Sequence, residues 1–398
     1  MNQADINSFD FESRINRRGT SCHKWDFDKR LTGREGLLPF WVADMDFRVA
    51  PVIEEALEKR LEHGIFGYTA RPDSLDEALI GWFFRRHRWN IKTTQILETP
   101  GIVPFIHMFL QEFTSPGDSV IIQEPVYYPF RKAIMNNGRN AVVNHLIRDD
   151  NGLWAMDLDG LSRLIDESGA KTLIFCSPHN PVGRVWREQE LLNLADLCRA
   201  KAVTVVSDEI HADLVHPGYR HIPWLSLPEE RLPRSLALVS ATKTFNIPGL
   251  TTAFAIVPDS DFRHSCQSML TALGLGEGSS SPLSYAAAEA AWREGEPWLN
   301  ALLGQIGRND ALLRERLTGE LPGVLPGELE GSYLEWLHMD YPGNLWEKLL
   351  DEGIWLSRGI DFGRGGETYM RMNIACPSSQ LEEGIDMMVR ALSGFRSP

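Results

Sequence analysis

The sequence predicts an α/β fold with a large domain built on a mostly parallel central sheet, followed by a smaller α+β domain. Apolar runs typical of strands alternate with amphipathic helical patterns through the middle of the chain, as expected where crossover helices join parallel strands. After about Pro282 the apolar runs thin out and a long helical pattern begins, which indicates a second unit. We therefore expect an N-terminal segment over residues 1–50 that packs with the small domain, a large domain over 51–285 and a small domain over 286–398.

Four apolar runs predict the strands of the large domain. Each run ends at a polar, Pro-containing or Gly-containing segment, as a buried parallel strand does where it leads into a loop. Ligands of open α/β sheets bind at the edge where the carboxyl ends of the strands meet, so we expect a site in the loops after these runs. The predicted strands cover residues 119–123, 172–176, 203–207 and 235–239.

Three helical patterns complete the prediction. Apolar residues from Leu191 to Cys198 recur at i, i+3, i+4 and i+7, which predicts an amphipathic crossover helix over 187–200. An apolar stretch predicts a helix over 105–113, and a long helical pattern over 298–317 opens the second unit.

Composition limits the classes of partner. The chain has 398 residues, of which 43% are hydrophobic and 24% charged, with a formal net charge of -14. This charge disfavours a protein that mainly binds nucleic acid or anionic lipid. The five cysteines are scattered and never form a C-x-x-C pair, and no apolar stretch is long enough to span a bilayer. We expect a reducing, cytoplasmic environment and no membrane partner.

Lys243 is the residue whose surroundings in the sequence indicate a functional site most clearly. It follows the predicted strand over 235–239 closely, within the segment Ser-Ala-Thr-Lys-Thr-Phe-Asn. The ordinary interpretation is a solvated lysine at a strand end, since lysine usually keeps its ammonium in water. A buried lysine instead has a lowered pKa and presents a neutral amine that reacts with an aldehyde, as an enzyme of pyridoxal phosphate requires. The surrounding residues favour the second interpretation.

Pyridoxal phosphate also needs an acid beside its pyridine nitrogen, a donor near its phenolic oxygen and a site for its phosphate. Asp208, in VVSDEIH, can supply the acid, although taken alone it reads as a helix N-cap. Asn180, in CSPHNPVGR, can supply the donor, although turn chemistry also explains an asparagine between prolines. Gly101 opens a predicted helix whose free N–H groups make an anion site, although many such helices bind nothing.

Asn180, Asp208 and Lys243 follow one another with spacings of 28 and 35 residues. In this order they resemble the cofactor-binding residues of fold-type I pyridoxal phosphate enzymes of the class I/II aminotransferase superfamily, and the resemblance covers nearly the whole chain. More narrowly, the chain is similar to the MalY/PatB family of carbon–sulfur β-lyases, often called cystathionine β-lyases. The segments that carry this similarity are LPFWVADMDF, HGIFGYT, SPHNPVGRVW, SDEIHADL and KTFNIPGL. The resemblance implies the aspartate aminotransferase fold and pyridoxal 5'-phosphate as cofactor.

The resemblance also implies roles for individual residues. Lys243 would bind the cofactor covalently and, once displaced by the substrate, move the α-proton. Asp208 would pair with the pyridine nitrogen and Tyr127 would stack on the ring, so these three are the predicted catalytic residues. Asn180 would contact the phenolic oxygen and the substrate carboxylate. The remaining predicted cofactor-binding residues are Gly101, Ile102, Val103, His211, Ser240 and Thr242.

Three further residues complete the predicted site. Tyr68, in GYT, resembles the tyrosine that reaches the phosphate of the neighbouring subunit, which implies a homodimer with shared active sites. Arg371, in YMRMNIAC, resembles the arginine that binds the substrate α-carboxylate, a planar anion suited to a bidentate guanidinium. Trp41 lies in the N-terminal segment at the expected entrance, and we expect it in the substrate pocket.

The sequence departs from the common aminotransferase pattern at two places. Residues 244–262 contain no Arg or Lys, where that pattern has an arginine for the phosphate. His211 stands where that pattern usually has a tyrosine. Both departures resemble the lyase family. His211, Asp213, His216 and His221 also allow a metal cluster, but their spacing matches no standard zinc signature, and we expect no metal.

The expected reaction is β-elimination. A lyase of this kind releases a thiol from an L-amino acid, such as cystathionine or an S-substituted cysteine, and forms pyruvate and ammonia. The alternative is a class I/II aminotransferase acting on an L-amino acid and a 2-keto acid, which uses the same residues. A third possibility is a regulator that only binds the cofactor. The chain shows no helix-turn-helix or basic arm for nucleic acid.

Overall fold

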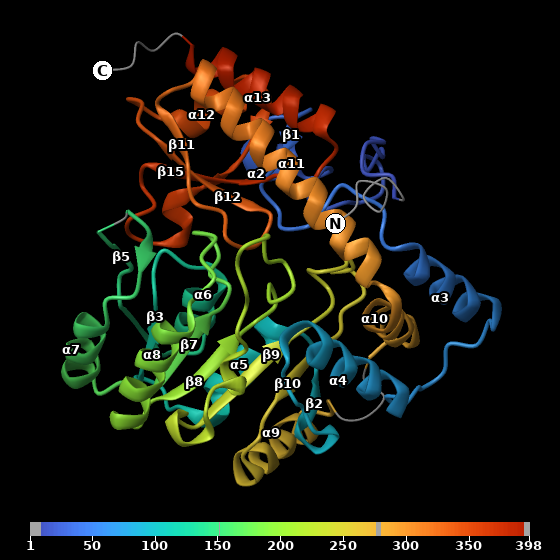
Figure 1. Cartoon of the computed structure of the whole chain (residues 1–398), viewed down its shortest axis with the longest axis vertical. Coiled ribbons are helices and arrows are strands. Elements are labelled where there is room, and N and C mark those ends of the chain that lie inside the picture. Colours follow the sequence, from blue (N-terminus) through green and yellow to red (C-terminus); the bar gives the residue numbers. More distant parts are fainter. Residues whose placement is uncertain (1–8, 151, 276–279, 394–398) are drawn as a thin grey trace.

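The computed structural model describes residues 9–150, 152–275 and 280–393. A 7-stranded sheet lies at its centre, with strand order β2-β10-β9-β8-β7-β3-β4 (Figure 1). Neighbouring strands are parallel except at β10, which runs antiparallel to β2 and to β9. The strands are β2 Ile96–Thr99, β3 Ser119–Ile122, β4 Asn140–Val143, β7 Thr172–Cys176, β8 Thr204–Asp208, β9 Ser235–Val239 and β10 Ala253–Ile256.

The four predicted strands are β3, β7, β8 and β9, and the prediction of a mostly parallel sheet is confirmed. The strand β8 starts and ends one residue later than predicted, so that Asp208 is its last residue. The strands β2, β4 and β10 were not predicted.

Helices cover both faces of this sheet. On one face, buried side chains such as Leu173 and Phe175 pack against α7 and α8. On the other face, buried side chains such as Ile122 and Ile174 pack against α5, α6 and α9. This is the layered arrangement that a nearly continuous apolar strand requires. The helices are α5 Ile102–Phe113, α6 Pro129–Asn136, α7 Leu158–Ser168, α8 Glu188–Ala200 and α9 Ser260–Ala272.

Two predicted helices begin at slightly different residues. Helix α8 was predicted over 187–200 and begins at Glu188, with Arg187 as its N-cap. Helix α5 was predicted over 105–113 and begins earlier, at Ile102. Pro104 does not prevent this, because it lies in the first turn, where a missing N–H costs no helical hydrogen bond.

A group of three helices lies beside the β2 end of the sheet (Figure 1). Helix α10 packs on both α3 and α4. The predicted boundary between the large and small domains, at residue 285, falls inside α10, and the domain limits stay a prediction. The three helices are α3 Pro51–Glu62, α4 Asp73–His87 and α10 Pro282–Glu294.

The C-terminal part of the chain forms a 4-stranded antiparallel sheet in the order β11-β12-β15-β14, covered by α11, α12 and α13. The long predicted helix is confirmed as α11. The N-terminal segment packs here too, because β1 pairs with β13. The elements are β1 Leu38–Pro39, β11 Val324–Pro326, β12 Leu334–Met339, β13 Ile354–Trp355, β14 Ser357–Arg358, β15 Tyr369–Asn373, α11 Glu296–Glu320, α12 Leu345–Asp351 and α13 Ser378–Leu392.

The smaller elements are α2 Asp28–Thr32, the paired strands β5 Ile147–Arg148 and β6 Trp154–Ala155, and short 3-10 turns at Thr93–Gln95, Trp224–Ser226, Glu229–Arg231 and Gly359–Phe362. None of the helices in the described part of the chain combines the length and apolar character needed to cross a membrane.

Candidate active site

The carboxyl ends of β7, β8 and β9 open into a cavity of about 200 Å³. The predicted residues that line it are Gly101, Ile102, Val103, Tyr127, Asn180, Asp208, His211, Ser240, Thr242 and Lys243. The lining residues that sequence reasoning missed are Ala43, Pro104, Cys176, Ile210, Pro248, Thr251, Thr252 and Ala253. A more open hollow of about 690 Å³ lies at the opposite edge of the sheet, beside Ser119, Thr172 and Thr204, and holds none of the predicted site residues.

Lys243 lies in the loop after β9, and its Nζ donates a hydrogen bond to the main-chain oxygen of Ala43 at 2.6 Å. Burial lowers the pKa of Lys243 to about 8, because the charged amine loses water there. Asp44 and Asp208 act in the opposite direction, and the Arg371 guanidinium adds to the lowering. A neutral amine is therefore available near neutral pH.

Asp208 ends β8, with Cys176 of β7 and Leu238 of β9 as its neighbours across the sheet. Its Oδ1 accepts a hydrogen bond from the backbone N–H of Ile210 at 3.1 Å. The residues after it form turns and not a helix, so the N-cap interpretation does not apply. Burial raises the pKa of Asp208 to about 7, which makes this carboxyl a group that shares its proton readily with a basic partner.

Two hydroxyls and a helix start lie together at one side of the cavity. Ser240 Oγ and Thr242 Oγ1 are 2.8 Å apart, and Ser240 Oγ donates to the carbonyl of Thr252 at 2.6 Å. The first N–H groups of α5 have no partners within the helix. Gly101, just before α5, has a φ of 134°, which L side chains rarely adopt. The free N–H groups at the start of α5 are neutral donors, and binding of an anion by them and by the two hydroxyls stays a prediction.

Arg371 is buried in β15, and its guanidinium donates hydrogen bonds to neighbouring residues. Its Nη1 donates to Asn180 Oδ1 at 3.0 Å, and its Nη2 donates to the carbonyl of Trp41 at 2.7 Å. Its Nε is buried without a hydrogen-bond partner among the described residues. A buried donor without a partner costs free energy, and a carboxylate bound here would satisfy it.

Tyr127 and His211 line the cavity beside these groups. Burial raises the pKa of Tyr127 to about 12, so its hydroxyl stays protonated. Burial lowers the pKa of His211 to about 3, so its ring is neutral. The Nδ1 atom of His211 has no hydrogen-bond partner among the described residues, and its ring lies edge-on to Tyr333, 6.2 Å away.

Besides Arg371, which lies beside the cavity, two predicted site residues do not line it. The indole of Trp41 stacks on Trp355, with ring centroids 4.3 Å apart, and its Nε1 donates to the carbonyl of Lys24. The Trp41 ring packs with Trp355, its carbonyl contacts Arg371, and its place in the substrate pocket stays a prediction. Tyr68 is fully exposed on its own chain, and its role stays a prediction.

The residues weighed as a metal cluster have separate partners. His87 Nε2 lies 2.8 Å from Asp213 Oδ1, whereas His221 pairs with Glu209 at 2.9 Å. Among the described residues, no group of three or more His, Cys, Asp or Glu side chains is arranged to hold a metal ion.

The donor set fits pyridoxal phosphate. Lys243 provides an amine with a lowered pKa, Asp208 a buried acid for a ring nitrogen, and the start of α5 with Ser240 and Thr242 an anion site. The amide oxygen of Asn180 is committed to Arg371, so its nitrogen remains as a donor. Which of these residues acts on the cofactor or the substrate stays a prediction.

Comparison with known proteins identifies the family of the chain. The family model for aminotransferase class I and II matches residues 38–388. The chain is 39% identical over 388 residues to cystathionine beta-lyase PatB of Bacillus subtilis (strain 168), covering 96% of this chain and 100% of PatB. It is 34% identical over 396 residues to protein MalY of Escherichia coli (strain K12), covering 98% of this chain and 100% of MalY.

Among solved structures, the fold matches a pyridoxal-phosphate-bound putative aminotransferase of Clostridium difficile 630 with a TM-score of 0.93 and 36% identity, covering 96% of this chain and 99% of that one. The family model matches most of the chain, and the similarity to PatB and MalY extends over nearly its whole length. The chain belongs to the class I and II aminotransferase family and, within it, groups with PatB and MalY.

Proposed function

We propose that this protein is a pyridoxal-phosphate-dependent carbon–sulfur β-lyase, of the cystathionine β-lyase or cysteine-S-conjugate β-lyase type. It releases a thiol from an L-amino acid and forms pyruvate and ammonia. The observation that carries the proposal is the cavity that gathers Lys243, Asp208 and Asn180, with Arg371 beside it, in a chain related along its length to a cystathionine beta-lyase.

When bound, pyridoxal phosphate supplies an aldehyde that binds an amino group and a ring that withdraws electrons from the α-carbon. Lys243 would hold the cofactor through Nζ and, once released, would take the α-proton of the substrate. A pKa of about 8 suits this work, because a general base is most effective when its pKa lies near the working pH.

Asp208 would hold the ring nitrogen of the cofactor. Its pKa of about 7 reflects the cost of burying a charge without a cationic partner. A basic ring nitrogen beside it would supply that partner, and the resulting pair would keep the proton on the ring.

Arg371 and Asn180 would bind the α-carboxylate of the substrate. The Nε atom of Arg371 is a buried donor that still lacks a partner, and the contact of Nη1 with Asn180 holds the guanidinium in place. Once the α-proton has moved to Lys243, the C–S bond breaks, both bonding electrons leave with sulfur, and the thiolate takes a proton from Lys243 or from a nearby hydroxyl. Water then converts the released aminoacrylate into pyruvate and ammonia.

We also propose a homodimer with shared sites and a cytoplasmic location. Tyr68 is fully exposed, and Ile65 and Phe66 beside it are more than half exposed, as expected of a segment that meets a second copy of the chain. All five cysteines lie in the described part of the chain and are unpaired, in keeping with a reducing compartment.

The first test is incubation of the cofactor-loaded protein with L-cystathionine and no keto acid. The expected result is pyruvate together with a free thiol, both absent with Lys243→Ala because no amine remains to hold the cofactor or move the proton. If turnover instead required a keto acid and yielded a new amino acid, the protein would be an aminotransferase. Activity that survives in Lys243→Ala would contradict either reaction.

A further inference from the structure

Residues 41–47 form an irregular segment, here called the strap, that contributes Ala43 to the wall of the cavity. The carbonyl of Ala43 accepts hydrogen bonds from Lys243 Nζ at 2.6 Å and from the buried Tyr333 hydroxyl at 3.1 Å. At its other end, the carbonyl of Trp41 accepts from Arg371 at 2.7 Å. The main chain of the strap therefore touches both the amine and the guanidinium of the site.

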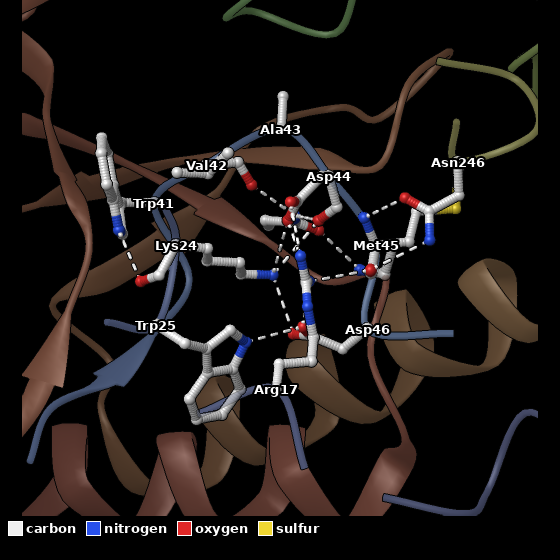
Figure 2. Close-up of polar contacts among 12 residues, drawn as sticks. Arg17, Lys24, Trp25, Trp41, Val42, Ala43, Asp44, Met45, Asp46 and Asn246 are labelled. Carbon is white, nitrogen blue, oxygen red and sulfur yellow. Dashed lines mark hydrogen bonds and ion pairs between the residues drawn. The ribbon is translucent and has the colours of Figure 1, made fainter. Parts of the chain in front are cut away.

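Asn246 connects the strap to the loop that carries Lys243. Its Oδ1 accepts from the N–H of Met45 at 2.8 Å, and its Nδ2 donates to the carbonyl of Met45 at 3.1 Å (Figure 2). Nδ2 also donates to the carbonyl of Phe47 at 2.9 Å. The amide thus uses its acceptor and both donor hydrogens on the strap. Asn246 has a φ of 57°, a left-handed conformation that asparagine tolerates better than most residues.

A second anchor holds the same end of the strap from the N-terminal segment. Figure 2 shows Arg17, Lys24 and Trp25 around Asp46. Arg17 contacts Asp44 at 2.7 Å and Asp46 at 2.6 Å, Lys24 Nζ lies 2.8 Å from Asp46, and Trp25 Nε1 donates to Asp46 at 2.9 Å. The Lys24 and Asp46 side chains are almost fully buried, so salt screens this anchor little.

The Trp41 end of the strap is held independently of Asn246. Ser357 Oγ donates to the carbonyl of Trp41 at 2.9 Å, and Asn373 Nδ2 donates to the carbonyls of Val42 and Asp44, each at 2.6 Å. None of these contacts involves Asn246, so a change at Asn246 should act on the part of the strap from Met45 to Phe47 and leave the Arg371 side in place.

We propose that Asn246 is a positioning residue: through the strap, it holds the carbonyl of Ala43 opposite Lys243 and thereby orients the amine that moves the α-proton. The inference deepens the proposed function, since it concerns the same site. It applies equally to amino transfer, because both reactions need Lys243 to move that proton.

The test compares Asn246→Gly with Asn144→Ala. Glycine retains the backbone conformation at position 246 and removes only the amide. Asn144 is a matched control, because it is buried, its Oδ1 accepts from Gln123, its Nδ2 donates to the carbonyl of Asp157, and it does not line the cavity. Both variants are loaded with pyridoxal phosphate and assayed for kcat, KM and hydrogen exchange of the peptide over the strap.

We expect Asn246→Gly to lower kcat about tenfold or more, with KM changed less than about twofold. A poorly oriented amine slows the transfer of the α-proton but does not change the affinity for the substrate. Exchange of the strap amides should rise about tenfold. Asn144→Ala should leave kcat and strap exchange within about twofold of the unchanged protein. Equal kcat losses in the two variants would overturn the proposal, as would unchanged strap exchange in Asn246→Gly.

Two measures keep this outcome separate from that of the proposed function. If the unchanged protein forms no pyruvate from L-cystathionine or from an S-substituted cysteine, the lyase assignment fails, and kcat is taken from the amino-transfer assay instead. If Asn246→Gly does not fold, Asn246→Asp replaces it. The aspartate keeps the bond to the N–H of Met45 but loses both donors, so the same fall in kcat and rise in exchange are expected, and their absence would overturn the proposal.

Discussion

Lys243, in the loop after β9, and Asp208, at the end of the neighbouring strand β8, face the same cavity, and burial moves the pKa of each toward neutral pH. The shifts have opposite signs because burial disfavours the charged form, which is the protonated form of an amine and the deprotonated form of an acid. The amine is thus ready to react and the acid ready to share its proton.

The first prediction at this scale concerns the pH dependence of cofactor capture by the ligand-free protein. Only the neutral amine attacks the aldehyde, whose oxygen leaves as water. The capture rate should rise with pH and level off above about 8, falling about tenfold for each pH unit below that value. Absorbance of the aldehyde at a series of pH values measures it.

Two variants assign this inflection to Lys243. Lys243→Ala should capture no cofactor by this route. Asp208→Asn removes the other group that titrates near neutrality and should keep the inflection. An inflection near the ordinary lysine pKa of 10.5 would contradict the prediction, because it would mean that the Lys243 amine is exposed to water.

Helix α13 meets the N-terminal segment at a close approach. A Cβ added at Gly384, in α13, would lie 2.6 Å from the ring of Phe40. Phe40 is fully buried and follows β1 directly, and β1 is paired with β13. The absence of a side chain at Gly384 therefore lets the segment that leads into the strap lie against the helix.

We predict that Gly384→Ala lowers the free energy of unfolding by about 1–3 kcal/mol, since a buried ring or the strand must shift. Gly307 is the matched control, because it lies inside helix α11 and an added Cβ would meet nothing within 4 Å. Gly307→Ala should stabilise by up to about 1 kcal/mol through helix propensity alone. Urea unfolding of both variants measures this, and similar effects in the two would contradict the close approach.

On the scale of the whole molecule, one cluster of buried apolar side chains joins the N-terminal segment to helices from both halves of the chain, including Phe40, Trp82, Trp292, Leu313 and Leu381. Outside that cluster, the segment over residues 61–68 exposes Leu61, Ile65, Phe66 and Tyr68. Exposed apolar side chains gathered in one segment are typical of a protein–protein contact, which supports the proposed homodimer.

A mixing experiment tests whether two copies share their sites. If Tyr68 of one copy serves the site of the other, a hybrid of Lys243→Ala and Tyr68→Ala chains contains one intact site. Equal amounts of the two variants, unfolded and refolded together, should then recover about one quarter of the unchanged activity. Each variant refolded alone is the control. A mixture no more active than the mean of the two controls would contradict shared sites.

Four of the seven strands of the central sheet, the edge at which the cavity lies and ten of its lining residues could be predicted from the sequence. This was possible because Asn180, Asp208 and Lys243 each lie at or shortly after the carboxyl end of a buried strand, and parallel strands bring the groups at their carboxyl ends together. The long helix α11 could also be predicted, since its apolar residues recur along one face.

The course of the strap could not be predicted from the sequence. Ala43 lies 200 residues from Lys243 in the chain. It contacts Lys243 through its main-chain carbonyl, which every residue has, so the residue type gives no indication of this contact. The same reason explains Trp41, whose ring packs on Trp355 while its carbonyl meets Arg371. Main-chain contacts between distant segments depend on how the two ends of the chain pack against the sheet. Local patterns of side chains do not predict that packing.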